Sequence, residues 1–405
     1  DGISNWAAMS LVTSGGNSYN GSSGFKIGAD AADLIWEKAN QVNVGINAEL
    51  FNGRLALSVD GYYQKTSGLL YNISTLATTG YTTRTANIGS LENKGLEVMV
   101  SGKIFDGPFK WELATNLSYT KNKLLSLDGV LDMKINGGGA NTGKVMHALM
   151  VGKPVSAFYM LRQDGIYQTD QEVPSKLYAK GVRAGDCKYF DYNNDGDITD
   201  DDRMYVGKVT PDIYGGITST MNWKNFDLSI FCQFAAGGKI LSAWKGCGGT
   251  EGTEHLGLAS SSIKGYKNGT LVDSEQFYNI SKYAANHYWR GEGTSNTVPR
   301  PTLAGTFTGG FGNNLVSTRY LEDASYFKFK TITLGYSLPH SLLSKIHVTG
   351  ARIFVSLDNF FTLTKYSGYD PEFSYESNPT GNSYGADFGE QATLKSFIIG
   401  ASINF

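Results

Sequence analysis

Residues 191–202, DYNNDGDITDDD, combine the residue types and the spacing of a metal site. Asp191, Asn193 and Asp195 occupy alternate positions, a glycine follows, and Asp202 is the twelfth residue. Calcium loops have this pattern, with oxygen side chains at positions one, three and five, glycine at six, a backbone carbonyl at seven and a carboxylate at twelve. The spacing predicts a calcium site formed by Asp191, Asn193, Asp195, Asp202 and the backbone carbonyl of Asp197.

The sequence around this loop does not predict the two helices of a calcium sensor. GVRAGDCKYF precedes the loop and RMYVGKVTPDIYGG follows it, and neither has an apolar stripe at helical spacing. Asp202 also replaces the bidentate glutamate of sensor loops, which favours a structural calcium site within an insertion at about residues 186–207. The alternative is an acidic turn rich in Asn and Asp that binds no metal.

Composition excludes several classes of protein. The chain has 405 residues, a formal net charge of -2, 50 Gly, 24 Tyr and 21 Phe but only 9 Pro. A nearly neutral charge gives no reason to expect nucleic acid as a partner. The first residues do not form a signal peptide, and no run of about 18 apolar residues predicts a membrane helix. Cys187, Cys232 and Cys247 fit no metal or disulfide pattern, and their state stays open.

Alternation of apolar and polar residues predicts an all-β fold. In residues 41–50, Val42, Val44 and Ile46 alternate with polar residues or glycine, and residues 54–64 repeat the period of two. The same alternation recurs in GLEVMVSGKI, WELATNLSYT, GITSTMNW, FDLSIFCQF, ARIFVSLDN and the terminal FIIGASINF.

The connections between these strands distinguish a membrane barrel from a soluble sandwich. The short links FNGR, FDGPF, WKNF and LPHSLLSKI alternate with long ones at about residues 65–90, 123–212, 237–325 and 359–391. Outer-membrane barrels alternate short periplasmic turns with long extracellular loops, and they have an apolar face toward lipid and aromatic residues where strands leave the hydrocarbon. Compact soluble domains seldom contain several loops much longer than about 15 residues. Aromatic residues at strand ends fit the barrel: Tyr63, Trp111, Tyr119, Trp223 and Phe405.

This alternation also predicts the orientation of the chain. If the short links are periplasmic, the acidic loop is extracellular and Phe405 lies in the periplasm. About nine strands are expected, or eleven if VSAFYMLRQDGIYQ adds a pair. Residues 1–40 are expected to form part of an extracellular loop, and residues 41–405 the barrel strands with their long loops.

Eight segments, in order, resemble the C-terminal part of SusC-like, RagA-type TonB-dependent outer-membrane transporters. They are NIGSLENKGLEV, LSYTKNKLLSLDG, DGIYQT, GDCKYFDYNNDGDITDDDRMYVG, PDIYGGITSTMNWKNFDLSIFCQ, LEDASYFKFKTITLGYSLP, DNFFTLTKYSGYDPE and a terminal barrel strand. The resemblance implies a 22-stranded barrel around a plug, with a SusD-like surface lipoprotein as a lid and TonB as the source of energy. It implies import of oligosaccharides or peptides, and a possible dimer of such pairs. The acidic loop matches a motif of such chains.

The resemblance leaves the plug, the TonB-contact segment and the first barrel half unaccounted for. Nine or eleven strands leave two open edges, which lipid cannot satisfy with hydrogen bonds. We therefore expect another chain or segment to supply the plug and the remaining strands. Two alternatives stay open: a passive porin-like channel, and a secreted soluble calcium-binding β-protein such as a lectin or adhesin.

Catalytic motifs are not apparent in the sequence. It contains neither a His-Glu-x-x-His metal motif nor a Gly-x-Ser-x-Gly nucleophile motif, so an enzyme is not expected. In KYSGYDPEFSYE, residues 365–376, we expect Tyr366, Tyr369 and Asp370 to pack the loop on the rim rather than to touch substrate. Substrate-binding residues stay unknown.

Overall fold

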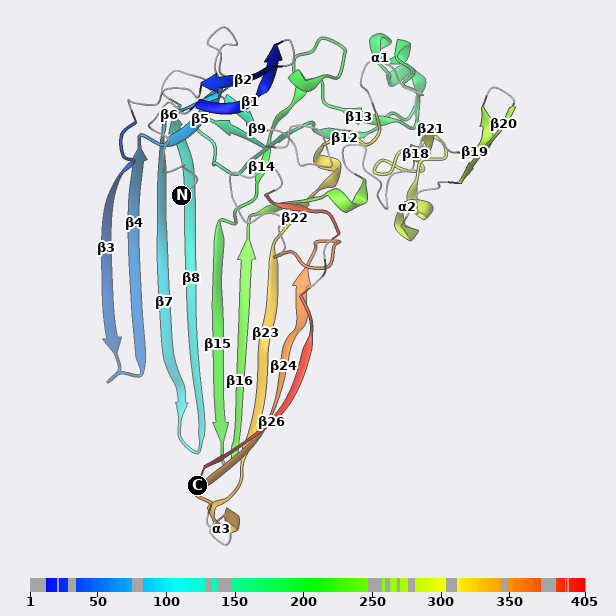
Figure 1. The fold of residues 1–405 in the computed structure, drawn as a ribbon. Helices are drawn as coiled ribbons and strands as arrows, with labels where there is room; N and C mark the ends of the chain where they lie inside the picture. The colour runs from blue at the N-terminus through cyan, green and yellow to red at the C-terminus, as the bar shows by residue number, and fades with distance from the viewer. Residues whose placement is uncertain are drawn as a thin grey trace.

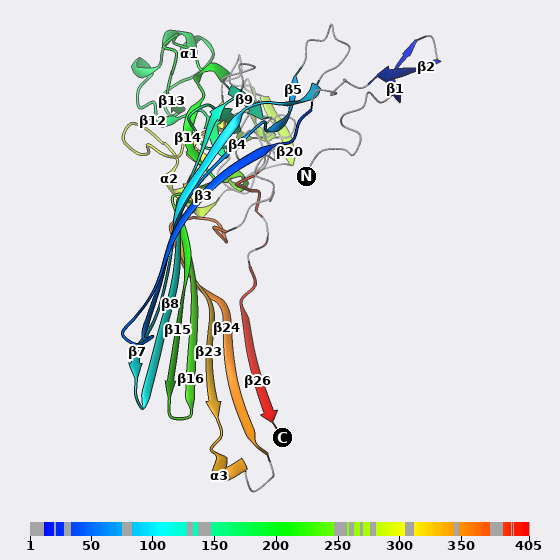
Figure 2. The same ribbon diagram turned by 90° about the vertical axis from the view of Figure 1, so that its left-hand side faces the viewer.

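The structure is a computed structural model of the chain. It describes residues 12–19, 22–27, 34–74, 83–127, 133–136, 147–246, 257–258, 263–267, 270–275, 281–303, 312–343, 348–372, 384–389, 391 and 393–404. A large antiparallel sheet of nine long strands dominates it, the smaller sheets gather with α1 and α2 at one end of these strands, and α3 lies at the other end (Figure 1). The view in Figure 2 shows that the long strands bend together as one curved wall.

The nine strands of the wall follow one another along the chain, from one edge of the sheet to the other. The order is β3-β4-β7-β8-β15-β16-β23-β24-β26, and every neighbouring pair is antiparallel. Their bounds are β3 Lys38–Leu50, β4 Leu55–Ser67, β7 Ser90–Asp106, β8 Phe109–Ser126, β15 Ile213–Trp223, β16 Phe226–Ala236, β23 Tyr326–Ser337, β24 Gly350–Thr364 and β26 Ser396–Asn404. The all-β antiparallel barrel fold and nine strands are confirmed.

The register places the apolar set of every strand on the same face. Residues directly opposite each other in an antiparallel pair share a face. Val44 lies opposite Gly61, Gly61 opposite Leu96, and Leu96 opposite Tyr119, and the same holds for the row of Ile46, Val59, Val98 and Leu117. At the other edge of the wall, Leu357 lies opposite Phe397. We call this apolar side the outer face and the opposite side the inner face.

Exposed apolar side chains cover the outer face. Val44 is 70% exposed and Ile399 66%, although both are aliphatic. A β-barrel in a membrane turns such a face toward lipid. Aromatic side chains gather at the lower end of this face, where Phe105 and Trp111 have ring centroids 6.0 Å apart and those of Phe226 and Tyr336 are 4.7 Å apart.

Short and long connections lie at opposite ends of the strands (Figure 1). Residues 51–54, 107–108, 224–225 and 338–349 form the short links, the last with α3 His340–Leu343. Residues 68–89, 127–212, 237–325 and 365–395 form the long ones, close to the predicted ranges. The strand near Gln41 begins at Lys38 and runs toward the short-link end, as predicted, and β26 also ends there (Figure 1). Phe405 lies outside the described residues.

The pair of strands expected around VSAFYMLRQDGIYQ does not extend the wall. This segment forms β11 and β12, but β11 belongs to a four-stranded sheet, β14-β11-β10-β9, and β12 pairs only with β13. The eleven-strand alternative is therefore wrong, because these strands are four residues long and pair within their own connection. The bounds in this connection are β9 Met133–Asn136, β10 His147–Met150, β11 Ala157–Met160, β12 Gln163–Ile166, η2 Asp170–Glu172, α1 Ser175–Ala179, β13 Cys187–Tyr189, η3 Asp200–Asp202 and β14 Met204–Lys208.

The other connections also contain short elements. Their bounds are β1 Val12–Tyr19, β2 Ser22–Ile27, β5 Leu70–Ser74, β6 Thr83–Asn87, β17 Lys239–Ser242, η4 Ala243–Lys245, β18 Gly257–Leu258, β19 Ile263–Lys267, β20 Thr270–Glu275, α2 Lys282–His287, β21 Thr302–Leu303, η6 Thr318–Tyr320, β22 Leu321–Asp323 and β25 Ala386–Asp387. Of the segment 1–40, residues 1–11, 20–21 and 28–33 lie outside the described residues.

Buried apolar clusters lie mainly in the long connections. One cluster contains Phe158, Leu241 and Tyr320, which come from three different parts of the chain. A second surrounds the acidic loop and includes Leu177 and Ile198. The connections therefore have cores of their own and form an ordered cap at one end of the wall. Among the described residues, no helix has the length and apolar character needed to cross a membrane.

Candidate functional site

The acidic loop, residues 191–202, lies in the long connection between β8 and β15. The strand β13 leads into it and the short η3 helix ends it, so the absence of flanking sensor helices is confirmed. Ile198, at position eight, is 4% exposed and packs with Leu177 of α1. Two backbone positions have the left-handed conformation, Asn194 at φ 58° and Gly196 at φ 79°, which Asn and Gly tolerate best.

Side-chain oxygens of the predicted ligands fold the loop by accepting its own amide protons. Asp191 accepts from the Gly196 amide at 2.7 Å, and Asp195 accepts from the Asp197 amide at 2.7 Å. Asp202 is fully buried and accepts from the amides of Tyr192 at 2.9 Å and Thr199 at 2.7 Å. These contacts shape the loop without an ion, since Asx turns satisfy its amides locally.

Two lysines contact the same loop, Lys176 of α1 and Lys180 at the C-terminal cap of this helix. Lys180 Nζ donates to both carboxylate oxygens of Asp197, at 2.5 and 2.7 Å, and Lys176 donates to the backbone carbonyl of Asp195. The hydrogen bond from Lys180 lowers the pKa of Asp197. In the part of the chain that the structure describes, no three His, Cys, Asp or Glu side chains are arranged to hold a metal ion. The calcium site stays a prediction.

A buried ion pair attaches this insertion to Arg300, two residues before β21, and Asn313 adds a hydrogen bond from the segment after β21. Asp186 is fully buried and accepts from Arg300, with Nε at 2.8 Å and Nη2 at 3.0 Å, and from Asn313 Nδ2 at 3.0 Å. Cys187 follows it, donates its amide to Asn313 Oδ1 at 2.8 Å, and has a thiol whose pKa is raised by burial. Both Cys187 and Cys232 are free thiols, and Cys247 lies outside the described residues.

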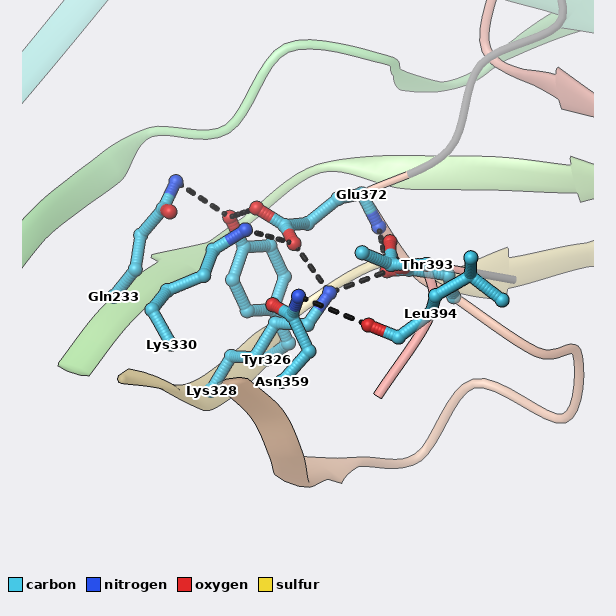
Figure 3. Close-up of polar contacts among 9 residues, drawn as sticks. Gln233, Tyr326, Lys328, Lys330, Asn359, Glu372, Thr393 and Leu394 are labelled. Carbon is cyan, nitrogen blue, oxygen red and sulfur yellow. Dashed lines mark hydrogen bonds and ion pairs between the residues drawn. The ribbon is translucent and has the colours of Figure 1, made fainter. Parts of the chain in front are cut away.

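A second charged cluster lies on the inner face, where the connection between β24 and β26 meets β23 (Figure 3). Lys328 Nζ donates to Asp370 Oδ2 at 2.8 Å and to Glu372 Oε2 at 2.6 Å. Lys330 donates to Glu372 at 2.7 Å, and Tyr326 OH donates to its other oxygen at 3.0 Å. We call these five residues the inner cluster.

Burial separates the inner cluster from a surface ion pair. The side chains of Lys328 and Asp370 are only 3% and 8% exposed. Burial alone would raise the pKa of Asp370, but hydrogen bonds from Lys328 and Thr393 outweigh it, so the pKa is lowered. The pKa of Glu372 is lowered for the same reason, by Lys328 and Lys330 against its own burial. Both carboxylates are therefore held in the charged form.

The residues just before Asp370 attach the same connection to the cap. Tyr366 is 5% exposed, donates its hydroxyl to Asp387 Oδ2 at 2.5 Å and accepts from Trp244 Nε1 at 3.4 Å. Burial raises the pKa of this phenol. Tyr369 is 79% exposed. The structural interpretation of KYSGYDPE therefore holds for Tyr366 and Asp370, whereas Tyr369 does not pack on the rim.

Sequence reasoning did not find the inner cluster as a unit. Its lysines lie in YFKFK and its carboxylates in YDPE, more than 40 residues apart. Lys328 and Lys330 alternate with aromatic residues in YFKFK, and this pair of lysines is the signal that could have indicated an inward site for carboxylates.

The fold and this arrangement define a class of protein: a membrane β-barrel wall with an apolar outer face and long connections attached to its inner side. Residues 5–197 match the family model described as TonB dependent receptor-like, beta-barrel. TonB-dependent receptor P3 of Formosa agariphila is 30% identical over 380 residues, which cover 92% of this chain and 34% of that protein. TonB-dependent receptor SusC of Bacteroides thetaiotaomicron is 26% identical over 92% of this chain and 32% of its own length.

A solved structure has the same fold. The RagAB peptide transporter structure aligns over 100% of this chain and 39% of that chain, with a TM-score of 0.72 and 23% identity. The resemblance seen in the sequence is confirmed, and the chain carries part of a SusC-like TonB-dependent receptor β-barrel. Proteins of this family are outer-membrane β-barrels. The chain spans about a third of the length of the curated relatives it matches.

Proposed function

We propose that this chain forms part of the wall and extracellular cap of an energised importer in the bacterial outer membrane. One observation carries the proposal: the outer face has an apolar band across all nine strands, while a buried ion pair attaches the connection between β24 and β26 to the inner side. That arrangement suits a lipid-embedded wall with a selective opening. Its chemistry is binding and gating, not bond breaking.

The proposed cargo is an oligosaccharide or a peptide, taken up together with a SusD-like lipoprotein lid and energised by TonB. The long connections are proposed to face the exterior and β26 to end at the periplasm, as the loop pattern of outer-membrane barrels suggests. The plug and the other barrel strands are proposed to come from another chain or segment, and the pairs of barrel and lid to form dimers. The apolar outer face disfavours a soluble lectin or adhesin.

Mass spectrometry of the complex purified from the outer membrane in mild detergent tests this assembly. The proposal predicts peptides of a plug, of further barrel strands and of a lid lipoprotein in amounts equal to those of this chain. Recovery of this chain without any of them would contradict it.

A cavity in the cap supports the proposed cargo class. It has a volume of about 430 Å³, and its lining includes Trp244, Tyr283 and Arg319. Aromatic faces can stack on sugar rings, and polar side chains beside them can form hydrogen bonds with a peptide backbone. Replacement of Tyr283 with Ala should weaken binding of a labelled peptide or oligosaccharide mixture to the purified complex. A matched Tyr178→Ala variant should bind normally, because Tyr178 is 41% exposed, against 50% for Tyr283, but does not line the cavity.

We propose that the acidic loop binds calcium and stays loaded outside the cell. The proposed ligands are the side chains of Asp191, Asn193, Asp195 and Asp202, whose oxygens already accept loop amides, together with the backbone carbonyl of Asp197. Carboxylate and carbonyl oxygens are what calcium prefers. The ion would stabilise a turn on the surface of the cap.

Limited proteolysis tests the calcium site. Calcium should protect the loop of the purified complex from cleavage, and the Asp195→Ala variant should lose most of this protection. Asp201→Ala is the control, since Asp201 lies in the same loop at a non-ligand position. Equal cleavage of the parent protein with calcium and with a chelator would contradict the site.

A further inference from the structure

The outer face of β3, β4, β7 and β8 changes from apolar to basic over two rows of residues. The register defines three rows, in order toward the cap: Val44, Gly61, Leu96 and Tyr119; then Val42, Tyr63, Lys94 and Lys121; then Asn40, Lys65, Glu92 and Lys123. We call Lys65, Lys94, Lys121 and Lys123 the lysine patch. It lies directly beyond the apolar band of the same strands.

On these four strands, the lysines at this height lie on the outer face. Gln64, Asn93 and Asn122, which alternate with the lysines, form the corresponding row of the inner face. Asn122 Nδ2 donates to Asn93 Oδ1 at 2.6 Å, and Asn122 Oδ1 accepts the amide of Val155 at 2.9 Å, so a long connection packs there. The inner amides serve loop packing, whereas Lys65, Lys94 and Lys121 are exposed on the opposite face.

The lysine patch is only partly neutralised by the protein. Glu92 is the one carboxylate in these rows, and it lies 3.7 Å from Lys94 Nζ. Four lysines and one glutamate leave three positive charges. Among the described residues, the pair with Glu92 is the one ion pair of the patch, and Lys65, Lys94 and Lys121 are exposed.

An open groove runs from the lysine patch into the apolar band. It has a volume of about 720 Å³ and is lined by Lys94 and Lys121 together with Val42, Val44, Leu96 and Tyr119. Gly61 forms part of its floor, and a Cβ there would meet only the Val44 carbonyl, at 3.9 Å. The groove thus joins two cationic groups to a surface that fits hydrocarbon.

The height of the apolar band places the lysine patch at a lipid head-group layer. On the outer face of β8 the band runs from Phe109 to Tyr119. Ten residues of strand extend about 33 Å and, at a tilt of about 40°, cover about 25 Å of membrane height, which is the thickness of the apolar band of outer-membrane barrels. Lys121 follows immediately.

We propose that the lysine patch and its groove bind a lipid with a phosphate-bearing head group, in the leaflet on the side of the long connections. The phosphate lies between Lys94 and Lys121, with Lys65 and Lys123 adding to the field, and an acyl chain follows Val42, Val44 and Leu96 over Gly61. Lysine binds phosphate as a point charge, and its aliphatic stem remains on apolar surface while the ammonium reaches the head groups. The occupant is a membrane lipid, because the groove continues into the hydrocarbon band. This proposal rests on the part of the proposed function that places the chain in the outer membrane. It does not depend on the proposed import activity.

Native mass spectrometry of the delipidated complex in detergent tests the proposal, with dioleoyl phosphatidic acid as the probe. Dioleoyl phosphatidylcholine tests the need for net negative charge, and inorganic phosphate tests the need for acyl chains. The variant Lys94→Gln with Lys121→Gln should bind phosphatidic acid about 30-fold less tightly, since each lysine near a membrane surface contributes about 1 kcal/mol. Lys94→Arg with Lys121→Arg should keep the binding.

The matched control is Lys103→Gln with Lys110→Gln. It removes the same charge from the same two strands, but on the inner face and near the short links. It should leave binding of phosphatidic acid unchanged. Equal losses in the two glutamine variants, full binding by Lys94→Gln with Lys121→Gln, or displacement of the lipid by inorganic phosphate at equal concentration would overturn the proposal. Failure of import would leave it standing, because the readout is lipid binding.

Discussion

The acidic loop and the inner cluster both bring carboxylates to lysines, yet their positions in the fold differ. Asp197 of the acidic loop and its partner Lys180 are each 21% exposed, and they lie 17 positions apart in the sequence. Lys328 and Asp370 of the inner cluster are 3% and 8% exposed, and 42 residues separate them. A partly exposed local pair shapes a turn, whereas a buried distant pair fixes a long connection to the wall.

The difference implies unequal energetic roles. An ion pair that remains in contact with solvent contributes little to the free energy of unfolding. A charge left alone in a buried site destabilises strongly, because its desolvation is no longer offset. The inner cluster should therefore determine whether the connection between β24 and β26 stays on the inner face, and the acidic loop should affect only its own turn.

Replacement of Lys328 with Met should give the largest effect. It leaves Asp370 and Glu372 close together without their shared ammonium, at a cost of about 3 to 5 kcal/mol. Hydrogen exchange of residues 366–372 in the purified complex should increase sharply. Lys330→Met is the matched control, since Lys330 is 25% exposed and contacts Glu372 alone. Exchange as slow as in the parent protein would exclude an anchoring role for the inner cluster.

Replacement of Arg300 with Met should have an intermediate effect on the insertion that carries the acidic loop. The fully buried Asp186 loses two charge-assisted hydrogen bonds but keeps Asn313 and the amide of Arg183, so about 2 to 3 kcal/mol is expected. Proteolysis of residues 186–207 should become faster. Arg290→Met is the control, because Arg290 does not pair with Asp186. Equally fast proteolysis in that variant would show that loss of the ion pair is not the cause.

Acidification should release the connection held by the inner cluster. The pKa of Asp370 and of Glu372 is lowered in the folded protein. A carboxylate with a depressed folded pKa contributes stability above its unfolded value, about 4, and that stability is lost as the pH falls through the folded value. Hydrogen exchange of residues 366–372 should therefore rise below about pH 4 in the parent protein. The same pH dependence in Lys328→Met would contradict this origin.

Replacement of Lys180 with Gln should have the smallest effect, below about 1 kcal/mol, because the pair with Asp197 is partly exposed. Removing this competing ammonium should leave calcium protection of the loop unchanged or stronger. Proteolysis at several calcium concentrations measures it. A marked loss of protection in Lys180→Gln would place the lysine among the groups that the site requires.

Sequence patterns predicted the wall because its determinants are local. The period of two in residues 41–50 and the turn at residues 51–54 specify strand faces and pairing without knowledge of distant residues. The same locality made the acidic loop visible. The prediction of two further wall strands in VSAFYMLRQDGIYQ was wrong because short strands within a connection show the same period of two as wall strands. Only their pairing partners distinguish the two kinds of strand. The inner cluster was missed because its two halves meet only after β23, β24 and the following connection have folded.

The measurement that tests the account most directly is TonB-dependent uptake by intact cells that carry the complete transporter. Labelled mixtures of peptides and of oligosaccharides are the probes, and cells lacking TonB or lacking the transporter are the controls. The account predicts that at least one mixture accumulates and that accumulation ceases in both controls. Uptake that persists without TonB, or no transporter-dependent uptake of either mixture, would contradict an energised importer.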